Sequence, residues 1–106
     1  MKVKRGDVIY LDYIIPRFEH IQGGNRPYVV VSNDIGNKHS DICMVCPMTT
    51  AKKKYLPTHA RIDNFQTVMC EQIFTINQSH IASVKSHLKT WQMKMVDRAL
   101  KAGFGL

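Results

Sequence analysis

The chain has 106 residues, 44% of them hydrophobic and 22% charged, and its 15 lysine and arginine residues exceed its 8 aspartate and glutamate residues for a formal net charge of +7. This composition is ordinary for a soluble globular protein and predicts a single domain over residues 1–106. No apolar run approaches the ~20 residues of a membrane span, and the basic N-terminus lacks the apolar stretch of a signal peptide, so we expect a cytoplasmic protein.

The positive charge favours a polyanionic partner, either nucleic acid or an acidic protein. A charge that serves only solubility explains the same excess equally well. An anionic membrane surface fits least, because no basic amphipathic helix with a broad apolar face stands out.

Strand signals dominate the first three quarters of the chain. Apolar and β-branched runs predict strands over 6–11, 28–32, 42–48, 58–62 and 67–73, with a further short strand over 84–88. Residues 33–37 are rich in turn formers and close the second strand, and a polar, basic connection covers 49–55.

Helical signals are confined to the end of the chain. Asn77 is placed to cap a single turn over 78–81, and Thr90 to cap a helix that stops near Gly103. The apolar residues of this helix recur at helical spacing: Trp91, Met95, Val96, Ala99 and Leu100. Short strands at close spacing with one terminal helix predict a mainly β (α+β) fold, a small and strongly bent barrel.

The three cysteines, an odd number, fit a reducing compartment. Cys43 and Cys46 form a Cys-x-x-Cys pair, but they fall on an expected strand, where residues three apart point to opposite faces and cannot hold one ion. Cys70 stands alone. We therefore expect neither a metal site nor a disulfide.

Residues 22–27, Gln-Gly-Gly-Asn-Arg-Pro, carry the most information. Gly23 and Gly24 permit a sharp turn and the close approach of a ligand, because no Cβ stands in the way. Pro27 fixes the backbone just behind Arg26, whose planar and permanently charged guanidinium suits a phosphate. Taken alone, such a motif is more often a surface hairpin loop that happens to carry an arginine.

Five segments in order resemble the MazF/PemK toxins: 3–10, 22–27, 33–37, 56–59 and 71–76, with a further match at 96–100. The resemblance covers nearly the whole chain and implies an SH3-like β-barrel with a C-terminal helix, of the CcdB/Kid/MazF kind. It also implies a bacterial type II toxin, a homodimer that cleaves single-stranded mRNA at short sequences without a metal or other cofactor. An acidic, partly disordered antitoxin is implied as its inhibitor.

By position, the resemblance implies that Arg26 and Thr49 are catalytic. In the Kid branch a histidine stands six residues before the arginine, as His20 does here, and Glu71 falls where the family has an acidic residue before a glutamine. We expect RNA contacts from Gln22, Gly23, Gly24, Thr50, Lys52, Lys53, Lys54 and Gln72. The three lysines suit the tracking of phosphates, or an acidic antitoxin tail that blocks the same groove.

Two substitutions and one shortened segment depart from the family pattern. Phe74 stands where many members carry an arginine, and Met69 where the Kid branch has a second catalytic arginine. The segment between the fourth and fifth strands is also shorter than usual. These departures bear on substrate choice more than on the class of reaction.

Metal-free RNA cleavage uses the 2′-hydroxyl as an internal nucleophile, and it requires a base, an acid for the leaving 5′-oxygen, and donors for the phosphorane. Arg26 suits the phosphorane, since a guanidinium gives up its proton only at high cost, and the neutral hydroxyl of Thr49 suits a non-bridging oxygen. His20 is either a proton carrier or a solvated loop residue. Glu71 either carries a proton when it is desolvated or pairs with a neighbouring group.

Two rival functions stay open. A gyrase-poisoning toxin on the same barrel, as in the CcdB relatives, acts through a tryptophan-bearing C-terminus, whereas Trp91 here sits at a helix start. A catalytically inactive barrel that binds RNA or antitoxin is disfavoured by the retention of both Arg26 and Thr49.

Overall fold

A computed structural model of the chain describes residues 2–13, 15, 25–51 and 55–106. In chain order its elements are β1 (Asp7–Leu11), β2 (Tyr28–Val30), α1 (Asp34–His39), β3 (Ile42–Thr49), β4 (His59–Arg61), β5 (Thr67–Met69), β6 (Phe74–Asn77), the 3₁₀ turn η1 (Gln78–His80), β7 (Ile81–His87) and α2 (Thr90–Phe104). Within these ranges no helix has the length and apolar character needed to cross a membrane.

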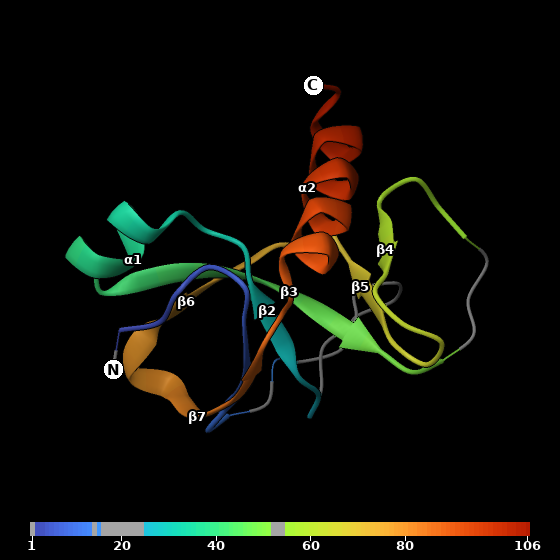
Figure 1. The fold of residues 1–106 in the computed structure, drawn as a ribbon. Coiled ribbons are helices and arrows are strands. Elements are labelled where there is room, and N and C mark those ends of the chain that lie inside the picture. Colours follow the sequence, from blue (N-terminus) through green and yellow to red (C-terminus); the bar gives the residue numbers. More distant parts are fainter. Residues whose placement is uncertain (1, 14, 16–24, 52–54) are drawn as a thin grey trace.

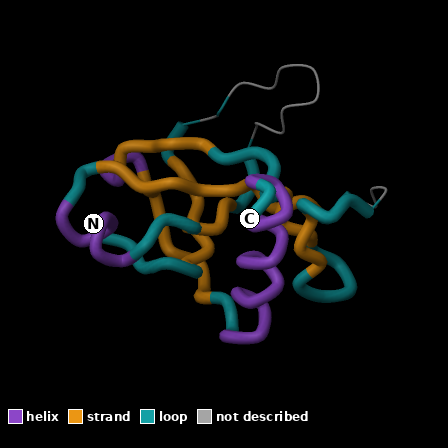
Figure 2. The backbone as a smooth tube through the Cα atoms, turned by 90° about the horizontal axis from the view of Figure 1, so that it is seen from above, coloured by secondary structure: helices purple, strands orange, loops and turns teal. Residues whose placement is uncertain are grey.

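The described strands form a seven-stranded antiparallel sheet in the order β4-β5-β3-β2-β1-β7, and β6 also pairs with β3. β3 is the longest strand and organises the sheet. One edge pairs with β2, while the other edge is shared, β6 pairing with Ile42 to Val45 and β5 with Met48 and Thr49. Figures 1 and 2 show α1 and η1 together at one end of the molecule, away from α2.

Both faces of the central strands are buried, which explains why β2 reads as a continuous apolar run. Alternate residues of each strand enter different clusters: Val29 joins one, and its neighbours Tyr28 and Val30 join the other. The first cluster is closed by Val96 and Ala99 of α2. The second is closed by residues of β6 and β7 on the bent sheet. The predicted mainly β fold with a C-terminal helix is therefore confirmed.

The cysteines follow the same alternation. Cys43 lies in the second cluster and Cys46 in the first, so the two thiols face opposite sides of β3, as expected. Burial raises the pKa of the Cys43 thiol to about 11. Contact with the Cys70 thiol, followed by burial, raises the pKa of Cys46 far above its ordinary range. All three are free cysteines buried in the core.

Three local predictions from sequence were wrong. Residues 33–37 do not form a turn only: Asn33 caps α1 by accepting from the Gly36 N–H at 2.8 Å. The strand predicted over 67–73 ends at Met69, because the chain turns there before β6 starts, with the Gln72 N–H donating to the Met69 carbonyl. β7 begins at Ile81 rather than at 84.

The ends of α2 also differ from the prediction. Lys89, not Thr90, is the N-cap residue, and its N–H donates to the Gln92 side chain at 2.8 Å. The helix runs past Gly103 to Phe104, and Gly105 caps it with a φ of 71°, a conformation that favours glycine. Trp91 is 53% exposed rather than packed on the sheet, whereas Val96 and Ala99 are buried as predicted.

Candidate active site

The ends of four strands place two arginines and two threonines in one row, here called the arginine–threonine row (Arg26, Thr49, Thr67 and Arg61). Thr49 pairs with Thr67, and Thr67 pairs with Arg61. Tyr28 pairs with Pro47, and the Met48 N–H donates to the Pro27 carbonyl at 3.0 Å, so continuing this register sets Arg26 beside Thr49. Directly paired residues in antiparallel strands share a face, so the row lies on the face opposite Met48, Ala60 and Val68, which pack in the first cluster.

Arg26 and Thr49 line the same pocket of about 410 Å³. Residues from β1, the start of β2, the end of β3 and the β4–β5 connection surround it: Tyr10, Asn25, Arg26, Pro27, Met48, Thr49, Thr50 and Gln66. The polar groups are a guanidinium, two threonine hydroxyls and side-chain amides. Such an assembly of donors around a fixed positive charge is suited to the oxygens of a phosphodiester.

Thr49 is held in place by the strand and by its own turn. It is 9% exposed, and its Oγ1 accepts the Ala51 N–H at 3.1 Å. A hydroxyl whose oxygen already accepts one hydrogen bond can still direct its O–H toward a ligand. Thr49 therefore offers a positioned donor at the wall of the pocket.

Arg26 is partly exposed and lies near the phenol of the buried Tyr28. Burial raises the pKa of Tyr28, the Arg26 guanidinium acts in the opposite direction, and Tyr13 adds to the increase. The Tyr28 ring itself packs edge-on against Phe74, with centroids 6.2 Å apart. Tyr28 therefore lies between the packed residues of the second cluster and the Arg26 guanidinium.

Tyr10 and Lys85 add an aromatic ring and a cation that sequence reasoning did not single out. Tyr10 lines the pocket, and Lys85 Nζ of the neighbouring strand β7 lies 5.9 Å from the Tyr10 ring centroid. Alternation along each strand was visible in the sequence, but the pairing of β1 with β7 joins segments some seventy residues apart. Only the net positive charge pointed toward a cation at such a place.

Glu71 belongs to a different group of residues. Its carboxylate contacts His59 Nε2 at 3.0 Å and accepts the Thr58 hydroxyl at 3.2 Å, and the His59 side chain is 4% exposed. Glu71 lies beyond the C-terminal end of β5, whereas Thr49 pairs with the first residue of that strand. The structure therefore does not bring Glu71 together with Arg26 and Thr49. Glu71 instead pairs with a neighbouring group, the alternative left open by the sequence, and that group is His59.

The other predicted site residues divide into two groups. Thr50 is exposed at the pocket, and Gln72 lies in the turn after β5, where its N–H donates to the Met69 carbonyl at 3.3 Å. The remainder lie outside the described residues: His20, Gln22, Gly23, Gly24, Lys52, Lys53 and Lys54. Among the residues that are described, no three His, Cys, Asp or Glu side chains gather as metal ligands.

The fold and the row of cationic and hydroxyl side chains define a bent, mainly β protein with a pocket suited to phosphate. Residues 4–104 match the family model of the PemK-like, MazF-like toxins of type II toxin–antitoxin systems. The chain belongs to this family, as the sequence motifs indicated.

Individual relatives agree with this assignment. The chain is 39% identical over 114 aligned residues to Endoribonuclease EndoA of Bacillus subtilis (strain 168), covering all of this chain and 97% of the relative. A solved endoribonuclease from a Mycobacterial species superposes with a TM-score of 0.82 at 20% identity, covering 100% of this chain and 94% of the other. An endoribonuclease in complex with its cognate antitoxin, also Mycobacterial, gives 0.81 at 20% identity, with coverages of 98% and 96%.

Proposed function

We propose that this chain is the toxin of a type II toxin–antitoxin pair and acts as a sequence-specific endoribonuclease on single-stranded mRNA. Family membership over residues 4–104 supports the toxin assignment. The name of the 39% identical relative supports the activity. The observation that carries the proposal to particular residues is the meeting of Arg26 and Thr49 in one pocket.

The pocket suits cleavage by the substrate's own 2′-hydroxyl. That oxygen attacks the adjacent phosphorus, the bond to the leaving 5′-oxygen breaks, and the products are a 2′,3′-cyclic phosphate and a free 5′-hydroxyl. Arg26 stabilises the charge that accumulates on the non-bridging oxygens of the phosphorane. Thr49 donates a hydrogen bond to one of the same oxygens. Neither role requires a bound metal.

A proton must leave the 2′-hydroxyl and another must reach the 5′-oxygen. Histidine is the side chain whose ordinary pKa suits such transfers near neutral pH, and His20 precedes the glycine pair next to Arg26. His20 is therefore our candidate proton carrier. Glu71, engaged with His59 and Thr58, is assigned to holding the β4–β5 region together.

The remaining contacts extend the site along the RNA. Thr50 lines the pocket, and Lys52, Lys53 and Lys54 follow it directly in sequence, where three cations suit successive phosphates. Gln22, Gly23, Gly24 and Gln72 complete the proposed RNA contacts. The same positive surface is suited to an acidic antitoxin segment, which would inhibit by occupying the substrate's place.

We also propose that the toxin acts as a homodimer in the bacterial cytoplasm. Exposed apolar side chains on α1 and β3, namely Ile35, Ile42 and Met44, are 77%, 49% and 44% exposed. A symmetric twofold interface is the commonest way to cover such side chains. A dimer mass in light scattering at micromolar concentration is the expected result, and a monomer mass would contradict it.

One assay tests the activity and its rivals together. The purified protein is incubated with a long RNA in EDTA, and the cut ends are mapped. Discrete cuts with 2′,3′-cyclic phosphate ends are expected. Cleavage that stops in EDTA would contradict the metal-free reaction, and no cleavage under any condition would leave a gyrase poison or an inactive binding barrel.

A further inference from the structure

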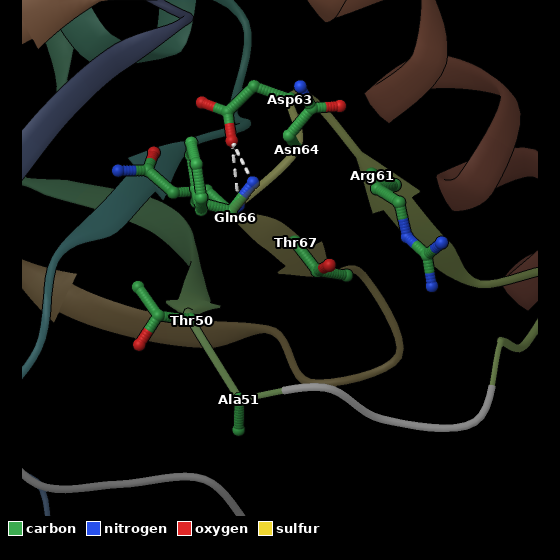
Figure 3. Close-up of a pocket in the computed structure, with 8 residues that line it drawn as sticks. Thr50, Ala51, Arg61, Asp63, Asn64, Gln66 and Thr67 are labelled. Atoms are coloured by element: carbon green, nitrogen blue, oxygen red, sulfur yellow. Dashed lines mark hydrogen bonds between the residues drawn. The ribbon is translucent and has the colours of Figure 1, made fainter.

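A second pocket lies beside the arginine–threonine pocket and has no part in the chemistry proposed above. It has a volume of about 480 Å³ and is formed mainly by the β4–β5 hairpin, including Arg61, Asn64, Phe65, Gln66 and Thr67 (Figure 3). We call it the hairpin pocket. Figure 3 shows Arg61 on one side, Thr50 and Ala51 on the other, and Thr67 between them.

The tip of the hairpin is held in one conformation by hydrogen bonds. Asp63 Oδ1 accepts the N–H groups of Phe65 and Gln66, both at 2.7 Å, and the Ile62 N–H donates to the Gln66 carbonyl at 3.1 Å. The base of the hairpin is fixed by α2, since Gln92 Nε2 donates to the Ile62 carbonyl at 3.1 Å. The backbone that carries the side chains of this hairpin is therefore preorganised.

Phe65 is turned outward while its neighbour Ile62 is buried. Ile62 is 1% exposed and lies in the core, whereas Phe65 is 78% exposed. Single exposed apolar side chains are common and carry no meaning alone. Phe65 differs because it lines a pocket beside an exposed arginine and two side-chain amides. An aromatic face, a guanidinium plane and amide groups are what proteins use to stack and read an unpaired base.

The hairpin pocket is continuous with the proposed catalytic pocket. Thr50 and Gln66 line both. Arg61 stands two strands from Thr49 in the arginine–threonine row, which is roughly 10 Å at the usual spacing between strands. A nucleotide next to the one held at Thr49 would therefore reach this pocket without any change in the sheet.

We propose that the hairpin pocket is a nucleobase subsite, which holds the unpaired base of a nucleotide neighbouring the scissile phosphate. Phe65 and Arg61 provide stacking surfaces, and Asn64 and Gln66 hydrogen-bond the edge of the base. The inference rests on the proposed function and adds a place where that function reads sequence.

The charges in the pocket favour a base over an acidic protein segment. Arg61 and Asp63 are its charged lining residues, so their charges cancel. A flat neutral group fits such a site, whereas an acidic segment or a phosphate would meet Asp63 as well as Arg61. An acidic protein segment is the alternative occupant, and oligoglutamate is used below to test for it.

A tryptophan placed at the tip reports stacking directly. Phe65→Trp in a Trp91→Phe background is titrated with mixed-sequence single-stranded 2′-fluoro RNA, which lacks the nucleophilic hydroxyl. Saturable fluorescence quenching is expected, because bases stack on the indole. The matched control carries Phe104→Trp in the same background, at the exposed end of α2, and is expected to show none. Oligoglutamate is the charge control.

The result separates this inference from the proposed function. RNA binding is followed independently by the polarisation of a labelled oligonucleotide. RNA that binds but quenches the Phe65→Trp variant no more than the Phe104→Trp control would overturn the subsite. Quenching by oligoglutamate alone would overturn it in favour of a protein partner. Quenching by RNA in a protein that cuts no RNA would keep base binding in the hairpin pocket and refute the nuclease.

Cleavage gives the second readout. Phe65→Ala is expected to lower kcat/KM on a long RNA about tenfold or more, in line with the loss of one base stack. It is also expected to relax the base preference at one position flanking the cut, whereas Phe104→Ala leaves both unchanged. An unchanged preference and rate in Phe65→Ala would contradict the proposal.

Discussion

The two ends of β3 carry polar residues of opposite kinds. At the Ile42 end lies the glutamine cluster (Ser32, Asn37 and Gln78), in which the side chains are 8%, 0% and 3% exposed. At the Thr49 end lies the arginine–threonine row, which opens onto two pockets. Both ends contain hydrogen-bonding side chains on a similar scaffold, so polarity alone does not tell a structural residue from a functional one.

The glutamine cluster is saturated by the protein itself. Gln78 Nε2 donates to the carbonyls of Asn37 at 2.8 Å and Ser40 at 3.0 Å, and its Oε1 accepts the Val3 N–H at 3.0 Å. Asn37 Nδ2 donates to the Ser32 carbonyl at 2.9 Å. These bonds tie the N-terminal segment, α1 and β3 together, so the polar groups of the cluster are used within the fold.

The arginine–threonine row is only partly used by the fold. Thr49 Oγ1 accepts one backbone N–H, and within the described part of the chain Arg61 has no hydrogen bond or ion pair with another side chain. A donor unpaired among the described residues, such as the Arg61 guanidinium, held at a rigid edge and open to solvent, binds an incoming anion without first breaking internal bonds. The site is therefore marked by side chains that are exposed and whose hydrogen bonds are not all satisfied within the fold, rather than by residue type.

The largest effect is expected from Arg26→Ala at the open end of β3. Cleavage should fall by more than a hundredfold, on the order of 3 kcal/mol of transition-state stabilisation. The free energy of unfolding should change by less than ~0.5 kcal/mol, because the side chain is outside the core. Single-turnover cleavage and urea unfolding measure the two, with exposed Arg98→Ala as the control. A rate within tenfold of wild type would make Arg26 a spectator.

His20→Gln tests which side chain moves the protons. We expect a rate loss of about a hundredfold. We also expect the loss of an inflection near pH ~6.5, the ordinary titration range of histidine. Single-turnover cleavage from pH 5 to 9 of both proteins decides this. Matching pH profiles would leave Arg26 and Thr49 as the catalytic residues and His20 as a solvated loop histidine.

Gln78→Ala removes the central side chain of the glutamine cluster at the Ile42 end of β3. Its loss leaves buried backbone groups without partners, which should cost about 2 kcal/mol of stability. Cleavage per folded molecule should be unchanged. Urea unfolding with Ser79→Ala as the exposed neighbouring control measures the loss. A stable Gln78→Ala protein with impaired cleavage would reverse the assignment of the two ends.

The smallest effect is expected from Glu71→Gln. Replacing the carboxylate weakens its contacts with His59 and Thr58, for about 1 kcal/mol of stability. The cleavage rate should stay within about threefold, because the carboxylate faces His59 rather than the pocket. A hundredfold slower reaction at equal stability would return Glu71 to the role of proton carrier.

Local pattern was enough for several parts of this molecule. The apolar runs at 28–31 and 42–48 predicted the two central strands, and the helical spacing of Val96 and Ala99 predicted the buried face of α2. The opposite placement of Cys43 and Cys46 followed from strand geometry. The predictions were wrong where a specific side-chain hydrogen bond, rather than average residue preference, decided the local structure. Asn33, for example, caps α1 in a segment rich in turn formers.

By itself the sequence determined the family, the order of the main elements and the identity of Arg26 and Thr49 as candidates, because short motifs and periodicity are properties of neighbours along the chain. Only the tertiary structure decided that Thr49, Thr67 and Arg61 share one row, that Glu71 pairs with His59, and that Lys85 lies over Tyr10. These contacts depend on the register between distant strands, and a slip of one residue would turn each side chain to the other face.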